Sequence, residues 1–445
     1  MKKSPISAIS RRRFVGGLAA SAAAITIVPR RVLGGQGFTA PSDTLNIAAI
    51  GAGGRARSDI AGCAHENIVA LCDVDWSMAA RSFAAFPKAA RYKDFRVMLE
   101  KEKGIDAVIV ATPDHVHAIA ATAAMQLGKH VYCEKPLTRT IAEARALGEL
   151  ARSSGVATQM GNQGHAMEGT RLIREWIEAD LIGTVREVHY WTNRPIWPQA
   201  IQRPTEAFHV PKDLDWDLFL GPAPFRPYHP AYHPFKWRGW WDYGTGALGD
   251  IACHAMDAAF WTFGLKDPTR IVAETTPLFK ETAPAAARIE YSFPETADRQ
   301  ALKVVWRDGG LNPPRPPVLE AHESLPSPSG QLFVGDKGLL TAGIYGENPH
   351  LYPQHLHDAV VADPPPQTYA RTEGVYKEWT EACKGNGVTG SDFADHSGPL
   401  TEMVLLGNLA VRTQEEIEWD AKKGRVTNVD EANEFLSEEP RKGWG

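Results

Sequence analysis

Cysteine is scarce in this 445-residue chain, and its spacing excludes several kinds of protein. The five cysteines are Cys63, Cys72, Cys133, Cys253 and Cys383, an odd number without any Cys-x-x-Cys pair. Such spacing predicts neither a disulfide framework nor a zinc site, so we expect no metal. Isolated core cysteines of this kind fit a chain that folds in a reducing compartment.

The chain also lacks an excess of basic residues and long apolar runs. It has 48 Lys and Arg against 53 Asp and Glu, which gives a net charge of -5. A protein that tracks nucleic acid phosphates needs a basic surface, so we expect no nucleic acid partner. Beyond the first thirty residues no apolar run approaches the roughly 20 residues of a membrane span. We expect no membrane association of the mature chain unless the amino-terminal segment is retained as an anchor.

The amino-terminal segment, residues 1–33, is basic and then weakly apolar. It begins "MKKSPISAISRRRFVGGLAASAAAITIVPRR" and contains Ser-Arg-Arg-Arg-Phe at positions 10–14. This pattern resembles a twin-arginine export signal, which predicts a periplasmic or otherwise exported protein. The alternative is a basic tail on a cytoplasmic enzyme. Several Ala-x-Ala choices leave the cleavage site open.

The remainder predicts two α/β domains after a linker at residues 34–43. Five apolar runs, at 45–50, 66–75, 106–113, 129–136 and 155–162, alternate with helical segments. This order predicts a Rossmann domain, a doubly wound parallel sheet, over residues 44–162. Longer alternating runs at 183–193, 287–294 and 301–310 predict an α/β domain with a large, mostly antiparallel open sheet over residues 163–445. A Trp- and Pro-rich segment, residues 194–243, predicts ordered functional loops.

A glycine turn follows the first apolar run directly. It reads Gly51-x-Gly53-x-x-Ala56, the spacing at which backbone approaches a pyrophosphate at a strand-to-helix turn. Asp73 ends the strand predicted in the second run, where a carboxylate binds ribose hydroxyls and repels a 2′-phosphate, so NAD is expected over NADP. Arg55 leaves NADP open, and a plain structural turn is the alternative. Asp75 is expected mainly to cap the next helix.

The fourth apolar run ends in two charges before a proline. Glu134 and Lys135 precede Pro136, at the strand end where doubly wound sheets bind ligands. Because the residue before proline favours extended backbone, Lys135 is expected to point toward the nicotinamide. The alternative is a surface ion pair.

A second polar cluster lies in "GALGDIACHAMDAAFW". Helical spacing puts Asp250 and His254 on one face, with Asp257 about one turn further on. Such a pair suits a general base and its orienting carboxylate. The alternatives are a satisfied core histidine and a helix-capping aspartate.

Together these motifs resemble the Gfo/Idh/MocA oxidoreductases, which act mostly on sugars and polyols. The resemblance covers nearly the whole chain after Ala40 and rests on "GAGGRA", "TPDHVHAIAATAAMQLGKHVYCEKPL", "GNQGH", "GDIACHAMD" and "LFVGDKGLL". It implies that Lys135 polarises the reacting hydroxyl, that Asp250 and His254 bind substrate, and that His254 exchanges the hydroxyl proton. It also implies a homo-oligomer, a dimer or tetramer, assembled through the second domain.

Further site residues follow from these motifs. The expected cofactor contacts are Gly51, Gly53, Gly54, Arg55, Asp73, Thr112, Pro113, His115, His117, Glu134 and Lys135. The expected substrate contacts are Asn162, His165, Arg194, Trp197, Arg238, Trp241, Asp242, Asp250 and His254. Aromatic rings beside polar side chains suit a carbohydrate. The alternative for the aromatic segment is a packed loop.

Three functions are compatible with these residues. The first is an NAD(P)-dependent oxidoreductase that oxidises or reduces a secondary hydroxyl or keto group of a sugar, polyol or glycoside. If the chain is exported, its cofactor must be tightly bound and recycled in place. The second is a redox-neutral NAD-dependent glycosidase, which the motif at Lys135 disfavours. The third is a non-catalytic sugar or cofactor sensor.

Overall fold

The first half of the fold is built on a six-stranded parallel sheet. The computed structural model describes residues 43–444. The strands are β1 (Asn46–Ile50), β2 (Asn67–Cys72), β3 (Ala90–Tyr92), β4 (Ala107–Val110), β5 (His130–Cys133) and β6 (Thr158–Met160). Their order is β3-β2-β1-β4-β5-β6, which confirms the predicted doubly wound sheet. The sequence did not indicate β3, because its three residues, Ala-Arg-Tyr, form no apolar run.

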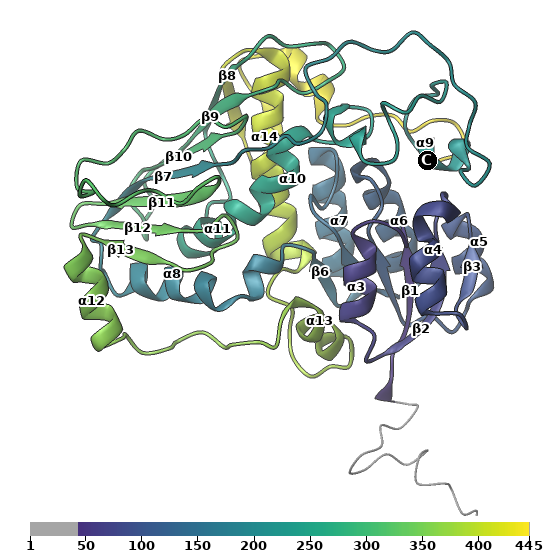
Figure 1. The fold of residues 1–445 in the computed structure, drawn as a ribbon, viewed down its shortest axis with the longest axis horizontal. Helices are drawn as coiled ribbons and strands as arrows, with labels where there is room; N and C mark the ends of the chain where they lie inside the picture. The colour runs from purple at the N-terminus through teal and green to yellow at the C-terminus, as the bar shows by residue number, and fades with distance from the viewer. Residues whose placement is uncertain (1–42, 445) are drawn as a thin grey trace, which may run out of the picture. The chain divides into compact units, whose positions relative to one another are not determined.

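Helices cover both faces of this sheet (Figure 1). The crossover helices are α3 (Ala56–Gly62), α4 (Trp76–Ala85), α5 (Phe95–Lys101), α6 (Asp114–Gln126) and α7 (Ile141–Ser154). Apolar residues of α5, α6 and α7 share one core with the sheet, and those of α3 and α4 share another. A late helix, α13 (Val375–Cys383), joins the second core through Val375 and Trp379. The carboxy-terminal part of the chain therefore returns to the first sheet.

The second half is built on a nine-stranded sheet. Its strands are β7 (Val185–Trp191), β8 (Arg270–Thr275), β9 (Ala287–Phe293), β10 (Leu302–Arg307), β11 (Gly330–Gly335), β12 (Leu339–Ala342), β13 (His350–Tyr352), β14 (Ile417–Asp420) and β15 (Arg425–Val426). The order is β13-β12-β11-β7-β10-β9-β8-β14-β15, and β7 with β10 is the parallel pair. The predicted, mostly antiparallel sheet is thus confirmed.

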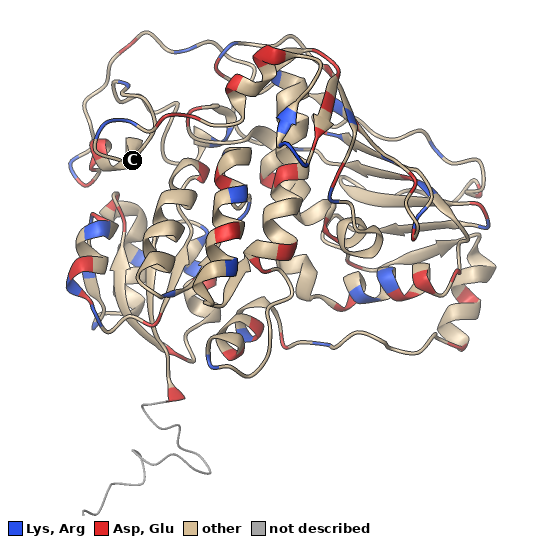
Figure 2. Cartoon of the chain, turned by 180° about the vertical axis from the view of Figure 1, so that it is seen from behind, with Lys and Arg blue, Asp and Glu red and all other residues tan. Residues whose placement is uncertain are grey.

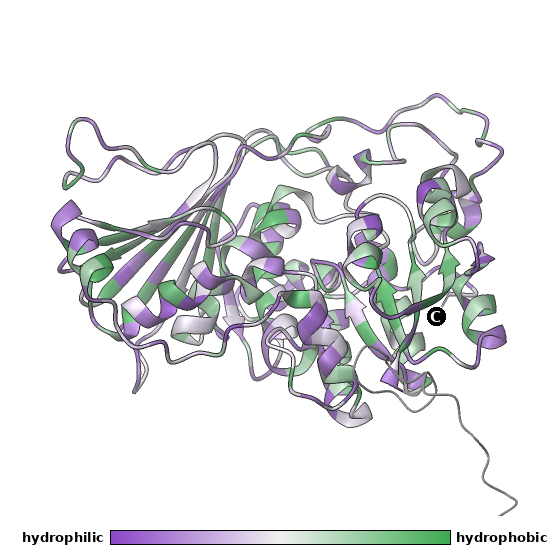
Figure 3. Cartoon of the chain, turned by 60° about the horizontal axis from the view of Figure 1, so that its bottom comes forward, coloured by the Kyte–Doolittle hydropathy of each residue, from purple (hydrophilic) through white to green (hydrophobic). Residues whose placement is uncertain are grey.

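Alternation along the strands gives this sheet a buried face. In β9, Ile289, Tyr291 and Phe293 are buried while the residues between them are half-buried. The buried face packs on helices, and the strands show hydrophobic green stretches beside hydrophilic purple ones in Figure 3. The helices of this half are α8 (Glu168–Glu178), α9 (Trp216–Leu220), α10 (Gly246–Ala255), α11 (Asp257–Phe263), α12 (Gln354–Ala362) and α14 (Gly398–Thr413). Short 3-10 helices occur at η3 (Gln163–Ala166), η4 (Lys236–Gly239) and η6 (Asp430–Phe435), and a π-helical turn occurs at η5 (Phe393–Ser397).

The buried helix α14 joins the two halves. It packs against α7 of the first half and against α10, β8 and β9 of the second. Arg145 on α7 forms a two-pronged ion pair with Glu402 on α14, with N to O distances of 2.6 Å. One apolar core runs through both sheets by way of these helices. Because α10 is held by α14, the side chains on α10 are fixed relative to the carboxyl ends of the parallel strands.

The distribution of charged residues and the lengths of the apolar helices in residues 43–444 agree with what the composition predicts. Acidic and basic residues are interspersed along the ribbon of residues 43–444 (Figure 2). Within that range, no helix combines the length and apolarity needed to cross a membrane. The predicted signal at residues 1–33 and the linker up to residue 42 lie outside the described residues.

Candidate active site

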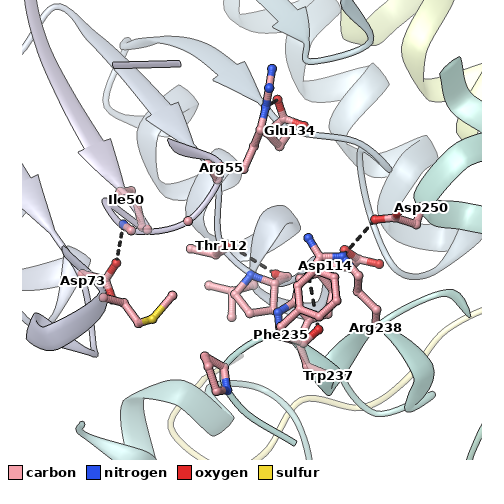
Figure 4. A pocket seen from close by; sticks show the side chains of 18 of the residues that line it. Ile50, Arg55, Asp73, Thr112, Asp114, Glu134, Phe235, Trp237, Arg238 and Asp250 are labelled. Atoms are coloured by element: carbon pink, nitrogen blue, oxygen red, sulfur yellow. Dashed lines mark hydrogen bonds and ion pairs between the residues drawn. The ribbon is translucent and has the colours of Figure 1, made fainter. Parts of the chain in front are cut away.

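A cavity of about 790 Å³ lies along the carboxyl ends of β1, β4 and β5. One end is formed by the glycine turn after β1 and by Asp73, and the other by Lys135 and the helix α10. This is the edge at which doubly wound sheets bind ligands, and the volume is typical of a small-molecule site. We call it the main cavity, and Figure 4 shows part of its wall.

The glycine turn has the geometry of a nucleotide-binding turn. Gly51 has φ of 84°, and a Cβ there would lie 2.7 Å from the carbonyl oxygen of Ala111. A Cβ at Gly53 would lie 2.9 Å from Cβ of Met78 on α4. Gly54 has φ of 52° and open space at the Cβ position, so its backbone is accessible to a ligand. The residues present therefore fit a dinucleotide.

Asp73 and Asp75 divide two tasks at the end of β2. Asp73 lines the main cavity and accepts hydrogen bonds of 2.8 Å from the backbone N–H groups of Gly53 and Asp75. Burial raises the pKa of Asp73 to about 6, against these two hydrogen bonds. Asp75 caps α4 by accepting from the N–H groups of Ser77 and Met78, as predicted.

Arg55 is held by carboxylates. Its Nε lies 3.2 Å from oxygens of both Glu134 and Asp59, and its Nη2 donates to the hydroxyl of Tyr376 at 2.9 Å. Figure 4 shows Arg55 and Glu134 meeting across the cavity from Asp73. The Arg55 guanidinium thus binds protein carboxylates and lies away from Asp73, the residue expected to bind the ribose hydroxyls.

Lys135 and Asp250 meet at the other end of the main cavity. The Lys135 ammonium donates to the Asp250 carbonyl at 2.8 Å and to its carboxylate at 3.1 Å. Arg238 donates to the same carboxylate oxygen at 3.0 Å (Figure 4). Burial alone would raise the pKa of Asp250, but the charges of Lys135 and Arg238 outweigh it and lower that pKa to about 2. Burial opposes the charge on Lys135, but Asp250 and Glu134 outweigh it and raise the Lys135 pKa.

His254 lies one helical turn beyond Asp250 on α10 and lines the same cavity as Lys135. No hydrogen bond joins it to Asp250 within residues 43–444, so the carboxylate expected to orient the histidine instead orients Lys135. The Nδ1 atom of His254 is buried without a hydrogen-bond partner among these residues. Burial and the nearby charge of Lys135 lower the pKa of His254 well below its usual value of 6.5. A neutral imidazole can accept a proton through a ring nitrogen that faces the cavity, to which the buried Nδ1 is not exposed.

Aromatic side chains from the loop between β7 and α10 form the opposite wall. Trp197, Phe235 and Trp237 line the main cavity, and the Arg238 guanidinium lies 4.7 Å from the Phe235 ring and 4.3 Å from the Trp237 ring. Figure 4 shows Phe235 and Trp237 facing Thr112 and Asp114. An aromatic wall beside ionised groups suits a ligand with apolar and hydroxyl faces.

The main cavity thus brings together most of the residues that the sequence indicated. They are Gly51, Gly53, Gly54, Arg55, Asp73, Thr112, Pro113, Glu134, Lys135, Arg194, Trp197, Arg238, Asp250 and His254. The lining does not include the other six indicated residues, which are His115, His117, Asn162, His165, Trp241 and Asp242.

His115 and His117 are buried behind the cavity wall. The ring nitrogens of His117 lie 2.8 and 2.9 Å from the carbonyl oxygens of Pro136 and Thr112. Those of His115 lie 3.3 and 2.9 Å from the carbonyl oxygens of Tyr243 and Phe219. The side chains of both histidines therefore point away from the cavity. Their contacts with backbone carbonyls stabilise the loops that carry lining residues.

Asn162 and His165 also turn inward, toward Asp257 at the start of α11. The Asp257 carboxylate accepts from Asn162 Nδ2 at 2.7 Å and lies 2.9 Å from His165 Nδ1 and 2.6 Å from His396 Nε2. Burial would raise the pKa of Asp257, but the two imidazoles outweigh it and lower the pKa well below its usual range. We call this buried group the Asp257 cluster.

The Asp257 cluster bears on the prediction that the chain holds no metal. Among the described residues, the ligand atoms of His165, Asp257 and His396 lie within 4.8 Å of one another, close enough to hold an ion. Both carboxylate oxygens are, however, already within hydrogen-bond distance of nitrogen atoms. The spacing is that of hydrogen bonds between the groups themselves, which satisfies a buried carboxylate.

Trp241 and Asp242 lie outside the main cavity as well. Trp241 is buried, with the Arg412 guanidinium 5.5 Å from its ring. Asp242 forms an ion pair with Arg226. Both therefore stabilise the loop that carries the aromatic wall.

Several lining residues were not indicated by the sequence. They are Tyr345, His233, Phe235, Asp114, Gln163 and Trp444. Tyr345 packs edge-on against His254 with ring centroids 4.7 Å apart, and His233 lies 2.8 Å from the Asp75 carboxylate. Tyr345 and Trp444 carry no local motif, whereas Asp114 and Gln163 lie within the quoted motifs and His233 and Phe235 within the Trp- and Pro-rich segment without having been singled out.

Comparison with known families defines the class of protein. Residues 45–162 match the family model GFO_IDH_MocA, described as an oxidoreductase family NAD-binding Rossmann fold. Residues 179–300 match the model of the C-terminal alpha/beta domain of the same family. The chain therefore contains both domains of the Gfo/Idh/MocA oxidoreductases.

Curated relatives share part of the chain. A levoglucosan dehydrogenase of Pseudarthrobacter phenanthrenivorans is 26% identical over 195 residues, which are 44% of this chain and 42% of that protein. A D-apiose dehydrogenase of Paraburkholderia graminis is 27% identical over 209 residues, 47% of this chain and 46% of that protein. The chain spans less than half the length of each of these relatives.

Solved structures share the fold over most of their length. The WlbA dehydrogenase of Bordetella pertussis, in complex with NADH and UDP-GlcNAcA, has a TM-score of 0.59 and 18% identity over 85% of this chain and 99% of that one. A levoglucosan dehydrogenase in complex with NADH and L-sorbose has a TM-score of 0.58 and 17% identity over 84% and 98%. At such identities the likeness concerns the fold.

Proposed function

We propose that this protein is an NAD-dependent oxidoreductase that oxidises a secondary hydroxyl of a sugar or glycoside, or reduces the corresponding ketone. The observation that carries the proposal is that Lys135 and His254, from the two halves of the fold, line one cavity that also contains the glycine turn and Asp73. The relatives named for levoglucosan and D-apiose support a sugar as substrate.

Lys135, Asp250 and His254, at the α10 end of the main cavity, have different roles in alcohol oxidation. A bound nicotinamide would accept the hydride from the substrate carbon. Lys135 stabilises negative charge on the reacting oxygen. Asp250 accepts a hydrogen bond from its ammonium and is itself oriented by Arg238. His254 takes the hydroxyl proton, since its lowered pKa keeps it neutral near neutral pH.

NAD is the proposed dinucleotide. Asp73 lines the main cavity with a carboxylate that would repel a 2′-phosphate bound beside it, and Arg55 is already paired with Glu134 and Asp59. Neutralising a 2′-phosphate would require a free cation beside Asp73. The NADH in the two similar structures is in keeping with this choice.

Export through the amino-terminal segment is part of the proposal and adds a requirement. An exported enzyme leaves the pool of free nicotinamide cofactor, so the cofactor would have to stay bound and be regenerated by a second substrate. A similar structure, from Caulobacter crescentus, is named an aldose–aldose oxidoreductase, a name that contains two sugars. A second sugar is therefore the proposed acceptor.

The function is tested by incubating purified protein with a panel of glycosides and aldoses, with and without added NAD. Nicotinamide absorbance and the masses of the products are followed together. A keto sugar that appears with reduced nicotinamide, or with a reduced second sugar, is the expected result. Hydrolysis without net reduction would identify a redox-neutral glycosidase, and binding without any product would identify a sensor.

The pH dependence of oxidation should report His254. Because burial and Lys135 lower its pKa, the acid limb of kcat/KM is expected below the value of 6.5 at which an ordinary histidine protonates. The rate should stay level as the pH falls through that value, because the base remains unprotonated. The variant His254→Asn should lose most of its oxidation activity, and its pH profile of kcat/KM should lack the acid limb. A limb centred at 6.5, or one that persists in the variant, would show that another group is the base.

A further inference from the structure

A second hollow lies directly beside the main cavity. Its volume is about 580 Å³, and its wall comes from three segments of the second half, residues 192–194, 326–329 and 343–348, with Ile251 from α10. We call it the side hollow. Its volume is within the range of about 300–1,000 Å³ that small-molecule sites occupy.

The two spaces share part of their walls. Arg194, Ile251 and Tyr345 line both the main cavity and the side hollow. Tyr345 is also the residue that packs against His254, the proposed base. The side hollow therefore adjoins the main cavity next to the proposed base, and a molecule bound at His254 would reach it past these three side chains.

The side hollow presents groups that bind hydroxyls. Asn193 is exposed, and within residues 43–444 its side chain makes one hydrogen bond, from Arg194 at 3.4 Å. Oε2 of Glu347 accepts from the Tyr345 N–H at 2.9 Å, and no other hydrogen bond to its carboxylate is found there. The hydroxyl of Ser329 lies 3.1 Å from that of Thr192. The wall of the side hollow thus offers both hydrogen-bond donors and hydrogen-bond acceptors.

Apolar side chains form the rest of the wall of the side hollow. Pro326 and Pro328 line the hollow from one loop, and Ile344 lines it beside Tyr345. A pyranose ring presents C–H faces to apolar surfaces and hydroxyls to polar groups at its edge, which matches this mixture. The single guanidinium at the shared wall and the single carboxylate of Glu347 favour a neutral ligand over a strongly charged one.

We infer that the side hollow is a subsite for a second sugar ring, so that the preferred substrate is a disaccharide or larger glycoside rather than a monosaccharide. This inference rests on the proposed function. The ring to be oxidised would lie between Lys135 and His254 in the main cavity. The ring attached to it would lie against Tyr345 and be hydrogen-bonded by Asn193 and Glu347.

The test compares pairs of ligands that share one ring. Methyl β-glucoside is compared with cellobiose, methyl α-glucoside with maltose, and methyl β-galactoside with lactose. Calorimetry on protein loaded with NADH, which cannot oxidise the sugar, gives Kd for each, and initial rates of oxidation give kcat/KM. At least one disaccharide is expected to bind roughly tenfold or more tightly than its methyl glycoside, because the second ring satisfies otherwise unpaired polar groups.

Variants then localise the effect. Ser327→Trp places an indole at an exposed position that lines the side hollow, and Asn193→Ala removes a polar group from it. Both should abolish or weaken the preference for the disaccharide and leave the methyl glycoside unaffected. Ser324→Trp is the matched control, since Ser324 is exposed on the same loop and outside the hollow.

Each outcome decides the inference. Equal affinity for both members of every pair would overturn it, as would equal losses for both members in Ser327→Trp or the same change in the control. If disaccharides bind more tightly, lose that advantage in Ser327→Trp, and yet no ligand is oxidised, the subsite stands and the proposed oxidoreductase activity falls.

Discussion

Lys135→Ala is expected to bind NAD as the unaltered protein does and to lower kcat for sugar oxidation by about 10²–10³-fold, the usual loss when one preorganised donor to a developing oxyanion is removed. The ammonium lies in the cavity, fixed by Asp250. The nucleotide turn lies at the other end, so cofactor affinity should not change. Fluorescence titration with NADH and single-turnover rates of hydride transfer measure the two quantities separately.

A control keeps this result interpretable. Arg238 still pairs with Asp250 when Lys135 is removed, so the buried carboxylate keeps a cation and the fold should persist. Lys129→Ala, at the start of the same run, removes a lysine whose ammonium donates to the carbonyl of Lys103 outside the cavity. Normal hydride transfer in Lys135→Ala would refute the assignment of this lysine.

Asp257→Ala is expected to lower the free energy of unfolding by about 3–5 kcal/mol, the usual result of removing one member of a buried ionic group. The substitution leaves His165, His396 and the Asn162 amide without their shared acceptor. Two imidazoles with ring centroids 4.4 Å apart would then face each other in a buried site. Urea unfolding at neutral pH measures the loss.

Asp395→Ala is the matched control for this prediction. Asp395 is adjacent to His396 in sequence, but its side chain is 76% exposed and pairs with Arg152 at the surface. Its removal should change the free energy of unfolding by no more than about 0.5 kcal/mol. If Asp257→Ala unfolds at the same urea concentration as this control, the Asp257 cluster does not stabilise the fold.

The parts of the site set by neighbouring residues could be predicted from the sequence. The glycine turn, Asp73 and Lys135 each follow a buried strand directly, so the strand position fixes where the side chain lies. Helical spacing placed Asp250 and His254 on one face of α10 in the same way. In each case the local pattern and the fold agree.

The parts of the site that depend on contacts between distant residues could not be predicted from the sequence. Asn162 and His165 follow β6 as expected, but Asp257, more than ninety residues later, draws their side chains inward. Asp250 pairs with Lys135 from the other half of the fold instead of with His254 on its own helix. Tyr345 reaches the cavity from a turn after β12 that carries no motif. Such contacts depend on tertiary packing, which periodicity does not encode.

The most direct test of the account is a crystal structure with NAD and an unreactive analogue of the best substrate from the glycoside panel. The account predicts one substrate hydroxyl within about 2.6–3.2 Å of both the Lys135 ammonium and a ring nitrogen of His254, with its carbon facing the nicotinamide. A substrate hydroxyl bound out of reach of His254, or a nicotinamide turned away from Lys135, would contradict it.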